Sequence, residues 1–313
     1  MTRSGTKKTQ LKGVIMLLIT AAIWGSAFVA QSVGMQDVEE FTFGGIRTLM
    51  GAFVLLPVIL LSDRKKRRDM DQAQLQAEKA ADRKVVRCGV ILGVVFCVAG
   101  NFQQFAFRYS TAGKIAFITA LYMFFVPVLG LFLKKRVPFL TWVCVFFGFV
   151  GLYFLCVDPS ELGAVNKGDL LALACSLCYA VHILLIERFA QEVDGVKLSC
   201  VQFFVGGLLC CVMMFLFESP DLASIVRAAV PLLYAGVMSC GVAYTFQIVG
   251  QKYTEATVAS LILCMESVFA VLAAALLLNE RLSGRELLGC AVMFAAILLS
   301  QVSEGLTEKL KKK

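Results

Sequence analysis

Ten long apolar runs dominate this sequence and restrict the chain to one fold class. They cover residues 13–32, 41–61, 88–107, 115–133, 138–157, 169–187, 198–217, 230–250, 256–278 and 285–302. A bilayer core of about 30 Å takes roughly 20 apolar residues per helix, which is about the length of each run. Hydrophobic residues make up 59% of the chain, whereas about 45–50% is usual for a soluble protein. The sequence therefore predicts an all-α integral membrane protein with ten transmembrane helices.

The basic residues outside the runs lie mostly on one side of the expected membrane. With the N-terminus in the cytoplasm, 23 lysines and arginines fall in cytoplasmic segments and 6 on the opposite side. The positive-inside rule then places both termini and the 62–87 loop in the cytoplasm. This topology explains the net charge of +8 without a nucleic-acid partner. We expect a multi-pass protein of the plasma or inner membrane, with the lipid bilayer as its partner.

The chain contains an internal repeat. Runs 1 and 2 match runs 6 and 7 at an offset of 155 residues, which aligns Trp24 with Tyr179 and Arg47 with Gln202. Runs 3–5 match runs 8–10 at an offset of 144, which aligns Gln103 with Gln247. Each copy has five runs, and because this number is odd, the second copy enters the membrane from the opposite side. Inverted repeats of this kind build secondary transporters, with the substrate site between the repeats near the midplane.

The repeat divides the chain into five expected segments. These are a cytoplasmic tail at 1–12, a first five-helix repeat at 13–157 that includes the 62–87 loop, a linker at 158–168, a second repeat at 169–302 and a basic cytoplasmic tail at 303–313.

Several motifs resemble one transporter family. "IWGSAFVA" in the first run, "GGIRTLMGAF" in the second, "YSTAGKIAFITALYMFFVPVLGLFL" through the fourth and "MESVFAVLAAALLLNERL" around the ninth are similar to the EamA-type branch of the drug/metabolite transporter superfamily. The resemblance covers residues 13–302. It implies that runs 1–4 and 6–9 surround a central cavity while runs 5 and 10 stand at the periphery. It also implies export of amino acids, other metabolites or drugs.

The sequence departs from the family pattern at two places. The Glu-Pro of the ninth span is Glu266-Ser267 here, and the Gly-Glu-Arg that closes the fourth span in many members is Lys134-Lys135-Arg136. The second half keeps Asn279-Glu280-Arg281. These departures concern the substrate subgroup and not the fold.

Only two charged residues lie deep inside the runs, Arg47 and Glu266. At 1.5 Å per residue, Arg47 lies about 9 Å from the outer end of its span and Glu266 about 15 Å from the inner end of its span. In a bilayer core about 30 Å thick, their depths therefore differ by only about 6 Å. Charged groups inside spans are costly and usually functional. Arg47 has a planar fork suited to a carboxylate or phosphate, or it is a structural residue that reaches the interface by snorkelling. Glu266 could exchange a proton during transport, or it is a static partner of Arg47 or of a hydroxyl.

Other polar and aromatic residues in the spans are candidates for a cavity lining. The substrate-binding candidates beside Arg47 and Glu266 are Trp24, Gln103, Gln247, Gln202, Tyr122, Tyr179 and Tyr244, and Asn101, Thr119 and His182 complete the set. Hydrogen bonds between helices explain many such residues in membrane proteins. His182, the single histidine, is interpreted as a packing residue. Cys175 and Cys178 form a C-x-x-C inside an apolar run without a second pair, so no metal site is expected.

The sequence favours a secondary transporter, an exporter of small metabolites or drugs that works by alternating access. No ATP-binding loop of the G-x-x-x-x-G-K-[ST] type is present, so the energy would come from a gradient, with a proton as one option, or from the substrate itself. No cofactor is expected. The alternative is an integral membrane enzyme, or a sensor or scaffold without transport; the spans hold no paired carboxylates, histidine cluster or nucleophile with its base.

Overall fold

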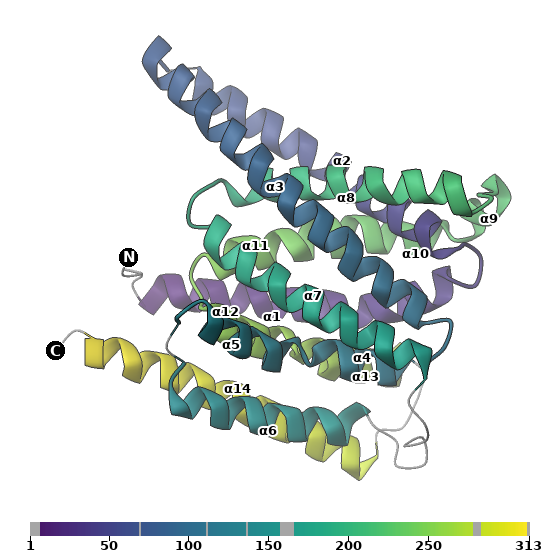
Figure 1. Ribbon diagram of the computed structural model, residues 1–313, viewed down its shortest axis with the longest axis vertical. Helices are drawn as coiled ribbons and strands as arrows, with labels where there is room; N and C mark the ends of the chain where they lie inside the picture. The colour runs from purple at the N-terminus through teal and green to yellow at the C-terminus, as the bar shows by residue number, and fades with distance from the viewer. Residues whose placement is uncertain are drawn as a thin grey trace.

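The computed structural model describes residues 7–68, 70–110, 112–135, 137–156, 166–277 and 283–311, and this part of the chain is helical without a strand (Figure 1). The elements are α1 (Lys7–Gly34), α2 (Glu40–Arg67), α3 (Gln72–Ala106), α4 (Ala112–Ala120), α5 (Tyr122–Phe132), α6 (Phe139–Cys156), α7 (Lys167–Phe189), α8 (Gly195–Phe217), α9 (Leu222–Arg227), α10 (Ala229–Leu233), the π-helix η2 (Tyr234–Tyr244), α11 (Thr245–Gln251), α12 (Ala256–Leu263), α13 (Met265–Leu277) and α14 (Gly284–Lys311).

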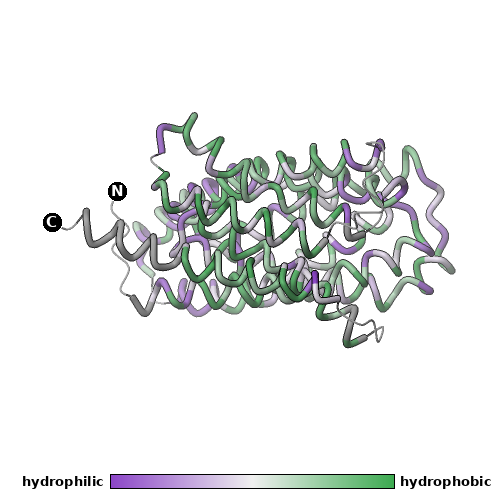
Figure 2. The backbone as a smooth tube through the Cα atoms, turned by 90° about the horizontal axis from the view of Figure 1, so that it is seen from below, coloured by the Kyte–Doolittle hydropathy of each residue, from purple (hydrophilic) through white to green (hydrophobic). Residues whose placement is uncertain are grey.

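Every run expected to cross the membrane is helical where it is described. Eight helical segments are long and apolar enough to span a bilayer. The fifth run forms the shorter apolar helix α6, and the tenth forms the first part of α14. Hydrophobic residues fill the middle of the molecule and hydrophilic residues gather toward its two ends (Figure 2). The predicted fold class, an all-α integral membrane protein, is confirmed.

The molecule has two polar ends. We call one the terminal face, because α1 starts and α14 ends there, together with the tip of the α2–α3 hairpin and the α7–α8 connection (Figure 1). The other, the far face, holds the α1–α2 and α8–α9 connections. Because α1 starts and α14 ends at the same face, the chain crosses between the two faces an even number of times, which agrees with ten spans.

The segment 62–87, expected to be a loop, is mostly helical. Helix α2 continues beyond its apolar part to Arg67, and α3 begins at Gln72. Asp71 caps α3: its Oδ1 accepts a hydrogen bond from Gln74 N, and Gln74 Oε1 accepts one from Asp71 N. This capping box, together with a sequence rich in Ala, Gln, Glu, Lys and Arg, stabilises the helix outside the apolar layer. The two helices therefore form a hairpin that projects from the terminal face (Figure 1).

Close helix pairs position the centre of the molecule. Helix α2 packs along α8, α3 lies against α7 and α8, and α1 packs against α13. Small residues allow this approach: a Cβ at Gly25 would lie 2.6 Å from the carbonyl oxygen of Glu266. Helices α6 and α14 pack mainly on each other at one edge (Figure 1). The resemblance implied this peripheral position for runs 5 and 10.

Three of the spans are interrupted. The fourth is divided at Leu121 into α4 and α5, and the ninth is divided at Cys264 into α12 and α13. The two breaks face each other, because Cys264 Sγ donates a hydrogen bond to the carbonyl oxygen of Ala120 at 3.4 Å. The eighth span contains the π-helix η2 over Tyr234–Tyr244. Discontinuous helices and π-helical turns are frequent at the binding sites of transporters and other proteins.

Candidate functional site

A small central cavity lies where the interrupted helices meet. Its volume is about 40 Å³, and it is lined by Trp24, Ala27, Phe28, Gln31, Arg47, Gln103, Thr119, Tyr122, Tyr179, Ile183, Ser239, Tyr244, Gln247, Leu263 and Glu266. These residues come from both halves of the chain. A volume of this size holds a few water molecules, whereas pockets for small-molecule ligands usually measure about 300–1,000 Å³. A metabolite would therefore enter only after helices move apart.

Arg47 forms a polar group on one side of the cavity. The residue is buried, with 5% of its surface exposed, and its Nη1 donates a hydrogen bond to Gln31 Oε1 at 2.8 Å. The same oxygen accepts a second hydrogen bond from Gln104 Nε2 at 2.7 Å. Gln31 thus orients the guanidinium toward the interior, and the side chain does not snorkel to the far face. Gln31 was not predicted to line a cavity, because one more glutamine in an apolar helix carries no signal of its own.

Glu266 lines the same cavity from the second half of the chain. It lies in the first turn of α13, where the helix dipole favours negative charge. Its Oε1 accepts a hydrogen bond from the hydroxyl of Tyr122, the first residue of α5, at 3.1 Å. The fourth and ninth spans therefore each contribute one of these side chains from the first turn after the break. No ion pair joins Glu266 to Arg47, both of which lie in the described part of the chain.

Aromatic side chains form a wall between these polar groups. The ring centroids of Trp24 and Tyr244 are 4.4 Å apart, and the hydroxyl oxygens of Tyr179 and Tyr244 are 3.1 Å apart. All three residues were predicted to line a cavity, and all three line this one. The wall offers apolar surface together with hydroxyl groups.

The lining follows the sequence repeat. Two pairs of lining residues are related by the 155-residue offset and three by the 144-residue offset. They are Trp24 with Tyr179, Phe28 with Ile183, Gln103 with Gln247, Thr119 with Leu263, and Tyr122 with Glu266. Tyr122 and Glu266 occupy the same position in the two copies and also hydrogen-bond to each other. The cavity therefore lies where corresponding positions of the two copies meet.

Four buried polar atoms at the cavity have no hydrogen-bond partner within the described part of the chain. They are the donors Trp24 Nε1 and Arg47 Nε, the acceptor Gln247 Oε1 and the hydroxyl Thr119 Oγ1. Most buried polar groups in proteins are hydrogen-bonded, and each exception needs an explanation. These atoms fit a polar ligand or ordered water in the cavity.

Two predicted lining residues, Gln202 and Asn101, lie elsewhere. Gln202 Oε1 accepts a hydrogen bond from His182 Nε2 at 2.9 Å, and both residues are fully buried between α7 and α8. Asn101 Nδ2 donates to the carbonyl oxygen of Cys97 at 2.8 Å. Gln202 is the repeat equivalent of Arg47, yet it does not line the cavity. The assignment of Gln202 as a cavity residue is therefore corrected.

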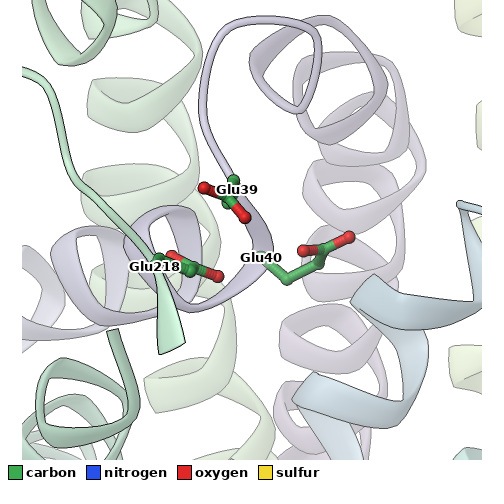
Figure 3. Close-up of side chains that lie close together, drawn as sticks. All are labelled: Glu39, Glu40 and Glu218. Atoms are coloured by element: carbon green, nitrogen blue, oxygen red, sulfur yellow. The ribbon is translucent and has the colours of Figure 1, made fainter. Parts of the chain in front are cut away.

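A group of three carboxylates, Glu39, Glu40 and Glu218, lies at the far face (Figure 3). Each carboxylate has a protein partner. Glu40 and Glu39 pair with Arg108, and Glu218 accepts hydrogen bonds from the first turn of α2. The contacts of the group explain it as a link between helix ends.

The comparisons with known proteins agree with this architecture. The model of the EamA-like transporter family matches the chain twice, over residues 11–157 and 166–301. The chain belongs to the EamA-like transporter family. Relatives of this EamA-like transporter include an "Uncharacterized transporter" of Archaeoglobus fulgidus, 25% identical over 90% of this chain and 83% of the relative. The "Uncharacterized transporter YoaV" of Bacillus subtilis is 22% identical over 93% of this chain and 97% of the relative.

A solved structure titled "Crystal structure of protein" has the same fold. It superposes on this EamA-like transporter with a TM-score of 0.75 and 16% identity, over 98% of this chain and 99% of the other.

Proposed function

We propose that this EamA-like transporter exports a small zwitterionic metabolite, of the amino-acid type, by alternating access. The observation that carries the proposal is the position of Arg47 and Glu266. They are the two charged residues of one cavity, they come from the two halves of the chain, and each has a neutral partner.

The chemistry of the lining supports this substrate class. A guanidinium binds a carboxylate through two parallel N–H groups, and Arg47 Nε has no partner among the described residues. Glu266 would attract an ammonium group, and the Trp24, Tyr179 and Tyr244 wall suits an apolar or aromatic side chain between the two charges. A charge that is buried without a counter-ion is costly. A zwitterion would neutralise both charges at once.

The arrangement of the two copies supports alternating access. Corresponding residues of the repeat meet at the cavity, and the interrupted fourth and ninth spans both line it. In inverted-repeat transporters the two repeats move against each other around such a central site. The small volume of the cavity fits a conformation closed toward both faces.

Glu266 is the proposed site of proton coupling. A permanently charged carboxylate in the middle of the membrane is costly to carry between access states. Tyr122 donates a hydrogen bond to Glu266 Oε1, a contact that favours the ionised form, and the neutral form would remove the charge when substrate leaves. The proton is therefore proposed to move in the direction opposite to the metabolite.

Ligand stabilisation of the purified protein tests the substrate class. Amino acids with apolar side chains carry both charges, whereas the corresponding amides keep only the ammonium charge and the corresponding N-acetyl derivatives keep only the carboxylate charge. We expect the zwitterions to raise the melting temperature more than either derivative. Arg47→Ala should abolish the preference over the amides, and Glu266→Gln should abolish the preference over the N-acetyl compounds.

Proteoliposome counterflow of the most stabilising amino acid then tests transport itself. Accumulation of unchanged label supports the transporter, whereas a new product identifies an enzyme, and binding without accumulation identifies a sensor. Gln202→Ala is the matched control, because Gln202 is the repeat equivalent of Arg47 but lies outside the cavity. Equal stabilisation by amide and parent compound in the wild type contradicts the proposed role of Arg47.

A further inference from the structure

Two thiols, one from each half of the chain, lie in contact outside the lining of the central cavity. Cys97 of α3 and Cys210 of α8 have their sulfur atoms 3.5 Å apart, and Asn101 Nδ2 lies 3.3 Å and 3.4 Å from them. Cys97 is 9% exposed and Cys210 is 5% exposed. Neither residue lines the cavity, so the proposed transport chemistry gives the pair no role.

The helices approach closely beside this pair. One turn before Cys97, a Cβ at Gly93 would lie 2.8 Å from the carbonyl oxygen of Gln202. One turn before Cys210, a Cβ at Gly206 would lie 3.3 Å from the carbonyl oxygen of Gly93. A disulfide needs a sulfur–sulfur distance of about 2.05 Å and Cα atoms within about 7 Å. The backbone contact one turn away holds the two helices close beside the cysteines. To form the bond, side-chain rotation has to shorten the sulfur–sulfur distance by about 1.5 Å.

We propose that Cys97 and Cys210 form an oxidation site at which a hydroperoxide closes a reversible disulfide between the two halves of the transporter. Hydrogen peroxide is small and uncharged, which suits a site inside the apolar layer. The amide group of Asn101 offers a hydrogen-bond donor to either sulfur once its proton has left.

The reaction proceeds in two balanced steps. One thiol is oxidised by hydrogen peroxide to a sulfenic acid, the O–O bond breaks, and one water leaves. The second thiol attacks the sulfenic sulfur, the S–O bond breaks, and a second water leaves with the thiol proton. The two cysteines lose two electrons in total, and a dithiol reductant reverses the change.

The bond would restrain the movement that transport requires. Helix α3 belongs to the first family match and α8 to the second, and alternating access needs these units to move against each other. This consequence depends on the proposed function, whereas formation of the bond does not.

Thiol counting tests the bond without any substrate. The chain has 12 cysteines, so alkylation of the denatured, reduced protein should add 12 groups. After treatment of the folded protein with hydrogen peroxide we expect ten, a linked peptide that joins Cys97 to Cys210, and a return to 12 with dithiothreitol. Cys97→Ser and Cys210→Ser should give no linked peptide and should not lose two groups, because a sulfenic acid on the remaining thiol removes at most one. Cys88→Ser, a buried thiol on the same helix, is the matched control and should still lose two.

Loss of thiols in other pairs, or no loss, overturns the oxidation site, and the wild-type measurement is sufficient if a serine variant does not fold. Hydrogen–deuterium exchange of the wild type tests the restraint. Uptake in α3 and α8 should be slower in the oxidised protein and return with reductant. A linked peptide with unchanged exchange overturns the restraint. A failed counterflow in the reduced protein concerns the proposed function alone.

Discussion

Helices α2 and α8 are joined by polar contacts at both of their ends. The repeat relates the positions that make these contacts, but the kind of contact differs between the two ends. At the far face, Glu218 accepts hydrogen bonds from Phe41 N, Thr42 N and Thr42 Oγ1, each at 2.7 Å. At the terminal face, Lys197 pairs with Asp63 at 2.9 Å. The 155-residue offset relates Thr42 to Lys197 and Asp63 to Glu218. The same two positions therefore hold a carboxylate on a helix N-terminus at one face and an ion pair at the other.

The difference lies in the number of partners. Lys197 also contacts Asp82 at 2.8 Å and Glu78 at 3.4 Å, both on the helical hairpin that projects from the terminal face. Glu218 instead binds the N-terminus of α2, whose unpaired N–H groups attract a carboxylate. At the terminal face Lys197 thus contacts three acids, which also pair with Lys66 or Arg67, whereas the far face depends on one acid at one helix end. Each end should respond differently to the loss of its central residue.

The largest effect is expected for Lys197→Met. The change removes the cation that contacts Asp63, Glu78 and Asp82 together, and leaves these acids with only their pairs to Lys66 and Arg67. Removal of one partner from a buried ion pair costs about 3–5 kcal/mol; solvent reaches this group, so we expect about 2 kcal/mol. A lower thermal midpoint and faster deuterium uptake over 62–87 would show it. Lys252→Met, which also removes a lysine from the terminal face, is the control, and an equal loss there would contradict the role of the network.

The next effect is expected for Glu218→Ala. It removes the carboxylate from the N-terminus of α2, a loss comparable to that of a capping residue, about 1–2 kcal/mol. Deuterium uptake should rise over residues 40–46 and remain unchanged over 62–87. Asp221→Ala, which caps only the short helix α9, is the matched control. An equal rise in deuterium uptake over 40–46 and 62–87 would contradict a contact that stabilises only the far face.

A smaller effect is expected for Asp63→Asn, the repeat equivalent of a change at Glu218. Lys197 keeps Asp82 and Glu78 as partners, so we expect a loss below about 1 kcal/mol. Thermal unfolding of Asp63→Asn and Glu218→Ala side by side checks the order. If Asp63→Asn is the more damaging of the two, the comparison of the two ends is wrong.

The smallest effect is expected for the exposed pair of Lys84 and Glu192 at the terminal face. The Lys84 ammonium lowers the pKa of the Glu192 carboxyl through a hydrogen bond. Any contribution of the pair to the free energy of unfolding is therefore present at neutral pH and is lost as the pH falls through that lowered pKa. Because solvent and salt screen the pair, Glu192→Gln should leave the thermal midpoint unchanged at pH 7. A clear drop would show that the terminal face relies on more than Lys197.

The candidate site was predictable in part. Arg47 and Glu266 could be predicted because an isolated charge in an apolar run can be recognised from the sequence without knowledge of the helix packing. Both residues line the cavity. Gln31 and Ser239 were not predicted, and Gln202 was assigned wrongly. In a membrane protein, lipid and protein interior are both apolar, so hydrophobic periodicity does not show which side of a helix faces the centre. Arg47 and Gln202 are equivalent in sequence, and only the packing around them separates their positions.

The sequence by itself determined the class of protein, the number of spans and the repeat. These depend on local apolarity and on similarity between segments. A segment that spans the bilayer core has to be apolar over its length, whichever helices it packs against in the folded protein. The tertiary structure alone decided the rest: the breaks at Leu121 and Cys264, the contact of Cys97 with Cys210, and the meeting of Tyr122 with Glu266. Each depends on which helix lies beside which and on how each is rotated, and that is fixed by packing between residues more than a hundred positions apart.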